Sequence, residues 1–398
     1  MALKFNQAKA ITLKNIKPLG VENVPLAQCL GREPMGKIRA PYDYPLRDVS
    51  AMDGFAYRFA DLKQGKGLHL VGERAAGDSA GKKLKKGQAA RIMTGGPVPP
   101  GADTVTIQEK AMVEGGTVVM MEKPTKGQNV RKQGEGTRRG EKITLPEGPL
   151  TARTLGFLAS LGAGSLYVKA KPKVKILVTG AELVRPGDKP GESGVFESNG
   201  LMLSAALREA GIKAEAHRVG DEENLLTGWV QKALVDCDIL LVTGGVSVGD
   251  HDPTKKAFHK AGVKRIFWCV LQKPGGPLFF GRKGKTAVFG LPGNPAAVYS
   301  CFQLYVRPLL QKLQGCSIPL PLKVRLSHSF QPLKKKILFA KAKWENKKNK
   351  KTVKVLGGQG SHLLESLARG DGLLEISPGS KPLKKGAILS FYPFREGS

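Results

Sequence analysis

Between residues 172 and 318 the chain alternates continuously apolar runs with amphipathic stretches. The apolar runs, which are typical of strands buried on both faces of a parallel sheet, lie at 174–178, 239–242 and 286–289. Shorter strands are predicted at 214–219 and 267–271. Segments with helical spacing fall between and after the strands, at 200–209, 225–234, from 253 onward and from Pro295 to about 312. Ser198-Asn199 is expected to cap the first of these helices, which Gly211 stops, and Asn294 is expected to cap the last. This repetition predicts a central three-layer α/β domain with a mostly parallel sheet.

The flanking sequence is predicted to be rich in β-strand. Short apolar pieces between glycine turns indicate a β-rich module within residues 41–139, with strands near 68–71, 89–93, 104–107 and 117–121. The chain loses helical period again after Gly315, and residues 319–398 are interpreted as a small β module with strands near 322–327, 338–344, 352–356, 373–376 and 387–392. Residues 150–161 have helical spacing and end at Gly162.

The apolar run at 239–242 leads into the most informative loop of the chain. Gly244, Gly245 and Gly249 allow a sharp turn and a close approach to a ligand, and Asp252 before Pro253 is typical of a helix start. A strand, a glycine turn and a helix start together form an anion site at the carboxyl edge of a parallel sheet. The alternative is a tight turn without a ligand. Asp250 and Asp252 favour the ligand, because acids beside an anion site are typical of a bridging divalent cation.

Composition excludes several classes of protein. A length of 398 residues with 41% hydrophobic residues fits several globular domains, and no apolar run is long enough for a membrane span. The N-terminus lacks the apolar region of a signal peptide, so we expect a cytoplasmic protein. The five cysteines are widely spaced, which favours buried apolar roles over metal ligation or disulfides.

The formal charge of +31 raises the question of polyanion binding. Much of this charge lies in three lysine-rich runs, at 82–86, 334–336 and 347–351. Because these runs lack interleaved aromatic residues, we expect solvated surface with at most weak, salt-sensitive nucleic-acid binding and no specific nucleic-acid partner.

Five ordered motifs resemble those of the molybdopterin molybdenumtransferase family, which includes MoeA and the C-terminal domain of gephyrin. They are Ser50-Ala51-Met52-Asp53-Gly54, Arg91-Ile92-Met93-Thr94-Gly95-Gly96, Thr179-Gly180-Ala181-Glu182-Leu183, Gly244-Gly245-Val246-Ser247-Val248-Gly249-Asp250 and Leu291-Pro292-Gly293-Asn294-Pro295. The resemblance covers nearly the whole chain. It implies a segmented linker domain at 1–40 and 140–171 that carries the inserted β-rich module at 41–139. An α/β molybdopterin-binding domain at 172–318 and a C-terminal β-barrel-like domain at 319–398 would follow.

The resemblance also implies an activity and a set of partners. Family members insert molybdenum from molybdate into adenylylated molybdopterin and release AMP, with Mg²⁺ assisting. They are homodimers whose cleft lies between the α/β domain of one subunit and the inserted module of the other. The implied partners are a second copy of the chain, the molybdopterin nucleotide and other cofactor-biosynthesis proteins or apo-molybdoenzymes. Sequence does not distinguish molybdate from tungstate.

Site residues follow from the resemblance position by position. The implied catalytic residues are Asp53, Glu182, Asp221 and Lys273. The implied ligand-binding residues are Thr94, Gly244, Gly245, Ser247, Gly249, Pro292, Asn294 and Ser361, and the implied metal ligands are Asp250, Asp252 and Glu182. Asp53 and Thr94 would come from the partner subunit.

The chain departs from the family pattern at four positions. Gly136 and Ala181 stand where an aspartate is usual, Gly276 stands where a lysine is usual, and Asp371 stands where an asparagine is usual. Removing two acids and one base from one cleft would weaken metal and oxyanion binding, and one lost oxyanion donor costs ~10²–10³ in rate.

Four functions are compatible with these observations. The first is a molybdenum-cofactor enzyme, active or attenuated, and the second is a catalytically weak paralogue that acts as a carrier, scaffold or regulator. The third is a polyanion-binding protein that uses the lysine runs, and the fourth is nucleotide pyrophosphate hydrolysis alone.

Overall fold

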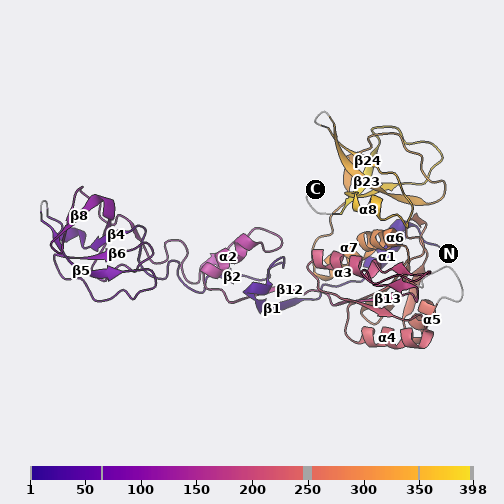
Figure 1. Ribbon diagram of the computed structural model, residues 1–398, viewed down its shortest axis with the longest axis horizontal. Coiled ribbons are helices and arrows are strands. Elements are labelled where there is room, and N and C mark those ends of the chain that lie inside the picture. Colours follow the sequence, from indigo (N-terminus) through magenta and orange to yellow (C-terminus); the bar gives the residue numbers. More distant parts are fainter. Residues whose placement is uncertain (1, 64–65, 245–252, 348–349, 395–398) are drawn as a thin grey trace. The chain divides into compact units, whose positions relative to one another are not determined.

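The computed structural model describes residues 2–63, 66–244, 253–347 and 350–394, and the chain forms two compact units (Figure 1). The larger unit contains residues 1–20 and 169–398, and the smaller contains residues 21–168. No helix among the described residues is long and apolar enough to cross a membrane.

A six-stranded sheet with the order β16-β13-β17-β21-β20-β18 forms the centre of the larger unit. Its strands are β13 Val174–Thr179, β16 Ala216–Val219, β17 Ile239–Thr243, β18 Lys264–Trp268, β20 Phe279–Lys283 and β21 Thr286–Leu291. The first four strands in this order are parallel, and β20 pairs antiparallel with both of its neighbours, β21 and β18. The prediction of a mostly parallel sheet is therefore confirmed, although β20 was not predicted.

Helices cover both faces of this sheet, as Figure 1 shows. Along β17, Ile239 and Leu241 face one core, while Leu240 and Val242 face the other. The first core is shared with α1 Phe5–Leu13, α3 Asn199–Glu209, α6 Pro295–Cys301, the π-helical segment Phe302–Val306 and α7 Arg307–Leu313. The second is shared with α4 Glu223–Val235 and α5 Pro253–Lys260. All five residues of β17 are buried, as the apolar run predicts.

The start of α3 differs from the sequence prediction. Ser198 occupies the N-cap position, but its side chain makes no capping hydrogen bond. Instead, the Glu197 carboxylate accepts a hydrogen bond from the Gly200 amide at 2.7 Å. A carboxylate is favourable here because it also complements the positive end of the helix dipole. The helix ends before Gly211, whose φ of 72° fits the predicted stop.

A second sheet lies in the C-terminal part of the larger unit, with the order β19-β23-β25-β26-β22 and with β24 paired to β23. Its strands are β19 Gln272–Lys273, β22 Leu322–Arg325, β23 Ile337–Lys347, β24 Lys350–Val355, β25 Gly372–Ile376 and β26 Ile388–Pro393, and α8 Glu365–Ala368 lies before β25. Five of these strands match the predicted positions. The sixth, β19, comes from the α/β segment and runs parallel to β23.

The smaller unit contains a six-stranded sheet with the order β7-β4-β6-β5-β9-β8. Its strands are β4 Gly54–Tyr57, β5 Leu68–Arg74, β6 Gln88–Ile92, β7 Thr104–Ile107, β8 Ala111–Glu114 and β9 Thr117–Met120. Shorter strand pairs accompany it: β1 Val21–Pro25 with β12 Ser165–Lys169, β2 Ile38–Arg39 with β11 Lys142–Ile143, and β3 Val49–Ser50 with β10 Val130–Arg131. Helix α2, Ala152–Ser160, matches the predicted helix that ends at Gly162.

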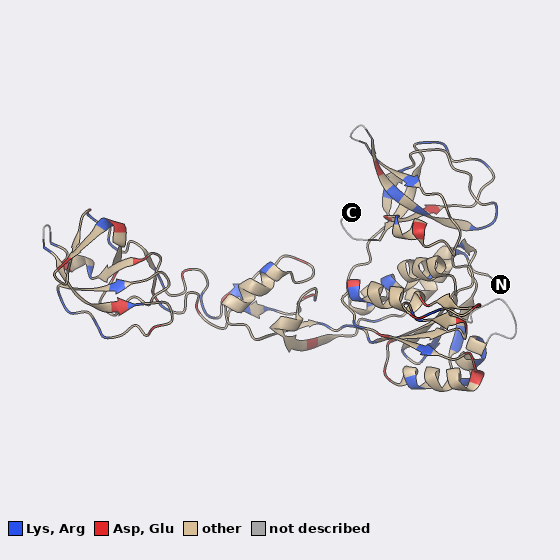
Figure 2. Ribbon diagram, in the orientation of Figure 1, with Lys and Arg blue, Asp and Glu red and all other residues tan. Residues whose placement is uncertain are grey.

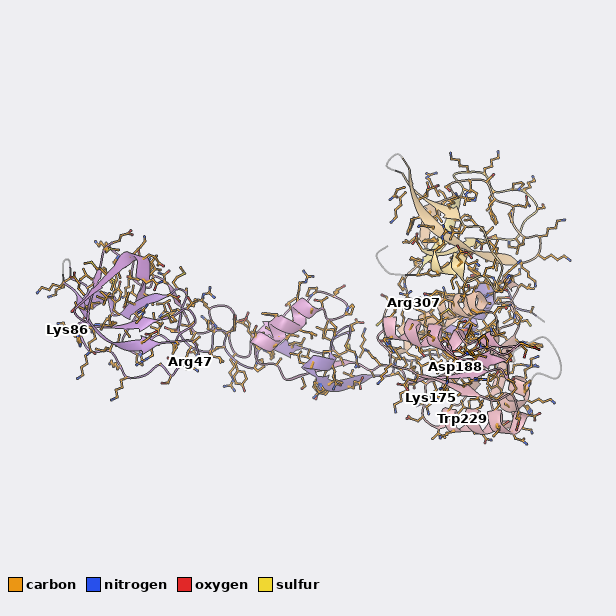
Figure 3. The ribbon with its side chains drawn as sticks, viewed as in Figure 1. Arg47, Lys86, Lys175, Asp188, Trp229 and Arg307 are labelled. Carbon is orange, nitrogen blue, oxygen red and sulfur yellow. The ribbon has the colours of Figure 1, made fainter. Side chains whose placement is uncertain are left out.

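Basic residues occur throughout both units and do not gather in one place (Figure 2). The lysines of the run 82–86 are exposed in the loop before β6, and Lys86 is labelled in Figure 3. The run 334–336 is exposed just before β23, and the run 347–351 falls at the junction of β23 and β24. These positions in loops and at a strand junction fit the interpretation of the runs as solvated surface.

Lys341 is an exception, because it is only 1% exposed. Its ammonium group donates to the carbonyl oxygens of Gly358, Gly360 and Leu363 at 2.8, 2.9 and 3.1 Å. Burial lowers its pKa from the ordinary lysine value. This one side chain therefore fixes the loop between β24 and α8.

We predict that Lys341→Met lowers the free energy of unfolding by about 3 kcal/mol, because three backbone carbonyl oxygens lose charge-assisted hydrogen bonds from a buried ammonium group. Lys343→Met is the matched control, since Lys343 is exposed on the same strand and should change stability by less than about 0.5 kcal/mol. Urea unfolding of both variants measures the difference. Equal stability of the two variants would show that the buried ammonium is dispensable.

Candidate active site

Three parallel strands end at the same edge of the central sheet. Val178 of β13 pairs with Thr243 of β17, and Thr243 pairs with Leu291 of β21. The loops that follow these strands therefore leave from neighbouring points. In open α/β sheets this carboxyl edge is where ligands bind.

Gly244 begins the loop that follows β17, and its backbone requires glycine. Its φ is 91°, and a Cβ atom there would lie 2.2 Å from the Thr179 carbonyl oxygen and 2.7 Å from the Thr179 hydroxyl. The backbone at Gly244 therefore lies directly against the end of β13. The remaining predicted residues of this loop, Gly245, Ser247, Gly249, Asp250 and Asp252, lie outside the described residues.

The loop after β21 connects the sheet edge with the C-terminal part of the same unit. Asn294 was predicted to cap α6, but its side chain makes no capping hydrogen bond. Its amide nitrogen instead donates to the Ser361 hydroxyl at 3.1 Å, and the Ala296 amide donates to the Ser361 carbonyl oxygen at 3.2 Å. Ser361 lies in the loop that Lys341 fixes. The structure thus brings two predicted ligand-binding residues, Asn294 and Ser361, into direct contact.

Two predicted acids lie near the end of β13. The Asp221 carboxylate accepts a hydrogen bond from the Ala181 amide at 2.7 Å, so Asp221 is fixed beside the residue that precedes Glu182. Glu182 itself is exposed, and its carbonyl oxygen accepts from the Val195 amide at 2.9 Å. No group of three or more His, Cys, Asp or Glu side chains suited to a metal ion occurs within the described ranges.

Lys273 is exposed on the short strand β19, above a buried polar network. The neighbouring Gln272 is 1% exposed, and its amide nitrogen donates to the Pro274 carbonyl oxygen at 3.0 Å. A Cβ at Gly275 would lie 2.4 Å from the Cys301 sulfur, which makes glycine necessary in this turn. The network therefore holds the backbone that presents Lys273.

Asp53 and Thr94 form a pair in the smaller unit. The Asp53 carboxylate accepts hydrogen bonds from the Thr94 amide at 2.6 Å and from the Thr94 hydroxyl at 2.7 Å. These bonds, chiefly the one from the hydroxyl, lower the pKa of Asp53 below its ordinary value. Both residues are exposed, so the pair presents an ionised carboxylate at the surface.

The departures from the family pattern occupy different environments. Ala181 is exposed, so an aspartate there meets no obstacle. At Gly276 a Cβ would lie 3.2 Å from the Gln272 carbonyl oxygen, and at Gly136 it would lie 3.2 Å from the Tyr44 carbonyl oxygen, so both sites are tight. Asp371 has a structural contact, because its carboxylate accepts from the Trp344 amide at 2.8 Å.

Two residues near the site were not predicted. Asn199 bonds to both the Thr243 hydroxyl and the Gly293 carbonyl oxygen, and Lys341 fixes the Ser361 loop. The polar Ser198-Asn199 pair before a helix was interpreted only as a cap. A lysine within an alternating strand pattern gives no sign that it is buried.

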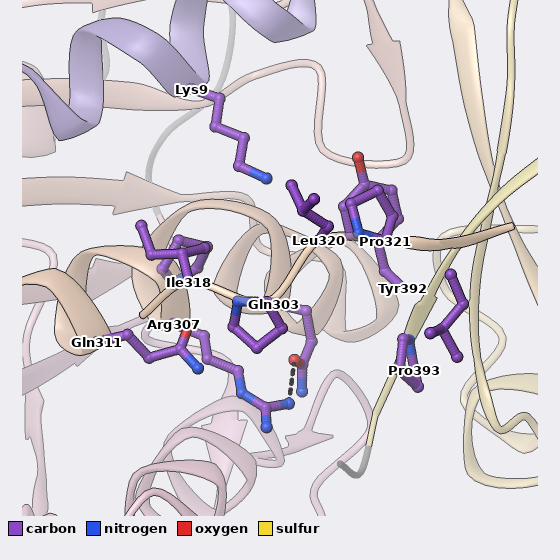
Figure 4. A pocket seen from close by; sticks show the side chains of 12 residues that line it. Lys9, Gln303, Arg307, Gln311, Ile318, Leu320, Pro321, Tyr392 and Pro393 are labelled. Atoms are coloured by element: carbon purple, nitrogen blue, oxygen red, sulfur yellow. Dashed lines mark hydrogen bonds between the residues drawn. The ribbon is translucent and has the colours of Figure 1, made fainter. Parts of the chain in front are cut away.

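A pocket of about 390 Å³ in the larger unit contains none of the predicted site residues (Figure 4). It is lined by Lys9, Gln303, Arg307, Pro308, Gln311, Ile318, Pro319, Leu320, Pro321, Leu322, Tyr392 and Pro393. Its walls are largely proline and aliphatic side chains away from the carboxyl edge of the sheet. We therefore take the sheet edge as the candidate site, because Gly244 and Asn294 follow strands that end there and Asp221 is bonded to the Ala181 amide just beyond β13.

The chain matches known sequence families over almost its whole length. Residues 3–162 match the MoeA N-terminal region (domain I and II), residues 175–312 match a probable molybdopterin binding domain, and residues 323–394 match the MoeA C-terminal region (domain IV). A molybdopterin molybdenumtransferase of Haemophilus influenzae is 31% identical over 98% of both chains. Molybdopterin molybdenumtransferase 2 of Mycobacterium tuberculosis is 33% identical over 93% of this chain and 94% of its own length.

The chain belongs to the molybdopterin molybdenumtransferase (MoeA) family. A solved structure of the same family agrees with this assignment. The molybdopterin biosynthesis MoeA protein of Pyrococcus horikoshii, at 26% identity, superposes with a TM-score of 0.74 and covers 99% of this chain and 100% of its own. Family membership confirms the resemblance and the multidomain α/β plus β fold.

We predict that Gly244→Ala lowers the free energy of unfolding by about 2 kcal/mol or more, because the added methyl group meets the Thr179 carbonyl oxygen and the φ is unfavourable. Gly293→Ala is the control, since nothing lies within 4 Å of a Cβ at Gly293 and its φ is not positive. Thermal unfolding distinguishes the two. If both variants melt together with the wild type, the close approach of Gly244 to β13 is wrong.

We predict that Thr94→Val raises the pKa of Asp53 toward the ordinary aspartate value, because the hydroxyl donor is lost while the amide donor remains. A pKa lowered by folding contributes stability above the unfolded pKa, and this contribution is lost as the pH falls through the folded pKa. Carbon-detected NMR titration measures the shift. The Asp61 carboxyl, whose pKa is lowered chiefly by Arg58, should titrate unchanged, and an unmoved Asp53 would contradict the pairing.

Proposed function

We propose that this chain is an enzyme of molybdenum cofactor biosynthesis that inserts molybdenum from molybdate into adenylylated molybdopterin with release of AMP. Relatives that are 30% to 33% identical over nearly its whole length are named molybdopterin molybdenumtransferases. These names favour the enzyme over a carrier, scaffold or regulator.

The observation that carries the proposal is the convergence of loops at the carboxyl edge of the sheet. The turn at Gly244 and the turn at Pro292–Asn294 follow strands that are direct neighbours. Loops of this kind offer backbone N–H groups to phosphate oxygens, and such donors stabilise the charge that develops when an anhydride breaks. A pyrophosphate-linked nucleotide therefore suits this edge.

The acids near β13 fit a role beside a cation. Mg²⁺ needs only one or two protein carboxylates, because water and phosphate oxygens fill its other positions. Glu182, together with Asp250 and Asp252, would hold it, and Asp221 is fixed nearby by the Ala181 amide. When bound, the ion would neutralise charge on the phosphate oxygens. The chain's own acids would orient the ligand at this end of the sheet.

The other predicted residues fit the handling of an oxyanion substrate. Lys273 presents an exposed ammonium group on a turn that Gln272 supports. Asn294 and Ser361 hold the loop after β21 against the loop that Lys341 fixes. We assign molybdate as the oxyanion, following the family, and expect tungstate to compete because both are tetrahedral dianions.

A four-part architecture belongs to the same proposal, with boundaries at 1–40 with 140–171, 41–139, 172–318 and 319–398. The family regions at 3–162, 175–312 and 323–394 support the ranges 172–318 and 319–398. Residues 1–20, in contrast, group with the larger unit by their contacts.

A parallel bridge between Leu326 and Val353 links the ends of the C-terminal sheet and supports its barrel-like closure. Limited proteolysis that cuts within 322–393 before it cuts near 318 would contradict the boundary.

We predict a homodimer, because the resemblance implies a cleft shared between two subunits and because Asp53 and Thr94 form an exposed pair in the inserted module. An obligate interface of this kind buries well over ~2,000 Å². Light scattering at micromolar concentration should give twice the mass of the chain, which is 42.7 kDa. A monomer mass under these conditions would leave Asp53 without the proposed role. We also propose that the protein acts in the cytoplasm.

We predict that the wild type converts adenylylated molybdopterin slowly. Ala181→Asp should raise kcat more than it changes ligand affinity, because the added carboxylate helps to neutralise charge mainly in the transition state. Single-turnover rates with and without molybdate test this. Gly276→Lys is the contrasting variant, since its crowded position predicts a loss of stability. Hydrolysis that ignores molybdate would favour pyrophosphate hydrolysis alone, and the absence of any turnover would contradict the proposed function.

A further inference from the structure

Asn199, the first residue of α3, lies where the loops of the candidate site leave the sheet. Its amide nitrogen donates to the Thr243 hydroxyl at 3.1 Å and to the Gly293 carbonyl oxygen at 2.8 Å. The Thr243 hydroxyl in turn donates to the Pro292 carbonyl oxygen at 3.2 Å. One side chain therefore ties α3 to the end of β17 and to the loop after β21.

The orientation of the Asn199 amide is fixed by these partners. The Gly293 carbonyl oxygen accepts hydrogen bonds and never donates, so only the amide nitrogen of Asn199 satisfies it. Both N–H bonds of this group are then used. The amide oxygen consequently points away from the Gly293 carbonyl oxygen.

That amide oxygen is buried and has no hydrogen-bond partner among the described residues. The Thr179 hydroxyl, at the end of β13 and against Gly244, is buried and unpartnered in the same way. Buried polar atoms without partners are rare and costly in folded proteins. Two of them at the carboxyl edge of one sheet indicate that something else supplies hydrogen bonds there.

The chemistry of an amide oxygen restricts which group can be its hydrogen-bond partner. An amide oxygen only accepts hydrogen bonds, and molybdate and ionised phosphates only accept them as well, so the two cannot pair with each other. The oxyanion is therefore excluded as its partner. The pterin and adenine rings, in contrast, carry amino groups and ring N–H groups that donate.

We infer that Asn199 has two roles: its amide nitrogen ties the end of β17 to the loop after β21, and its amide oxygen accepts a hydrogen bond from a donor group of the organic substrate. Asn199 is thus a positioning residue on one side and a recognition residue on the other. The inference rests on the proposed function, because it takes adenylylated molybdopterin as the ligand of this edge.

The test compares Asn199→Ala with Thr243→Val, which removes the Thr243 contact and leaves the Asn199 amide oxygen in place. Both variants should melt below the wild type, because both break the link between the loops. Asn199→Ala should weaken the affinity for adenylylated molybdopterin about fivefold to tenfold more than Thr243→Val does, which corresponds to one neutral hydrogen bond. The KM for molybdate should be the same in the two variants.

Equal losses of affinity in the two variants would overturn the inference and leave Asn199 as a structural link, with an internal water as the partner of its oxygen. A molybdate KM that rises only in Asn199→Ala would also overturn it. If the wild type itself fails to bind adenylylated molybdopterin, the proposed function fails instead.

A measurement on the wild type covers the case in which Asn199→Ala does not fold. In protein labelled with ¹³C at asparagine side chains, the Asn199 carbonyl carbon should shift on addition of adenylylated molybdopterin and stay fixed on addition of molybdate alone. Asn346, which is exposed in β23 of the same unit, is the internal control. An Asn199 resonance that does not move at saturating ligand would contradict the hydrogen bond.

Discussion

The candidate site depends on the parallel register of β13, β17 and β21. Because Val178, Thr243 and Leu291 lie side by side, the chain leaves all three strands at one edge. The strands are held there by two apolar cores, which cover both faces with alternate residues of the same strands. A slip of one residue in β17 would exchange Leu240 and Leu241 between the cores, so packing fixes the edge at which Thr243 and Gly244 appear.

Polar contacts add what apolar packing cannot provide, namely the relation of each loop to the next. Asn199 joins Thr243 to Gly293, and Asn294 joins the next turn to Ser361. Each contact is directional, so it fixes the loop backbones more narrowly than dispersion does. The buried ammonium of Lys341 completes this series, because it holds the loop that contains Ser361.

The sequence predicts strands and helix ends correctly where a local pattern is compatible with only one structure. The apolar run at 239–242 predicts a doubly buried strand, and Gly162 and Gly211 end helices as expected. Prediction from the sequence fails for polar residues that have several partners to choose from. Asn294 resembles an N-cap, yet a serine 67 residues away takes its amide, and Glu197 replaces Ser198 as the cap of α3. Such choices depend on tertiary contacts, which local sequence does not contain.

The turn at Ala181 is held by hydrogen bonds to its backbone. The Ala181 amide binds Asp221, and the Arg218 guanidinium donates to the Ala181 carbonyl oxygen at 3.4 Å, so the backbone of the turn is held without any side chain at position 181. The usual aspartate would add charge to this turn and is not needed to shape it. Gly276 is different, because a Cβ there would lie 3.2 Å from the Gln272 carbonyl oxygen, so a larger residue requires a small shift of the turn. The two positions therefore differ physically: a side chain at 181 extends from an exposed turn, whereas a side chain at 276 must displace the backbone around it.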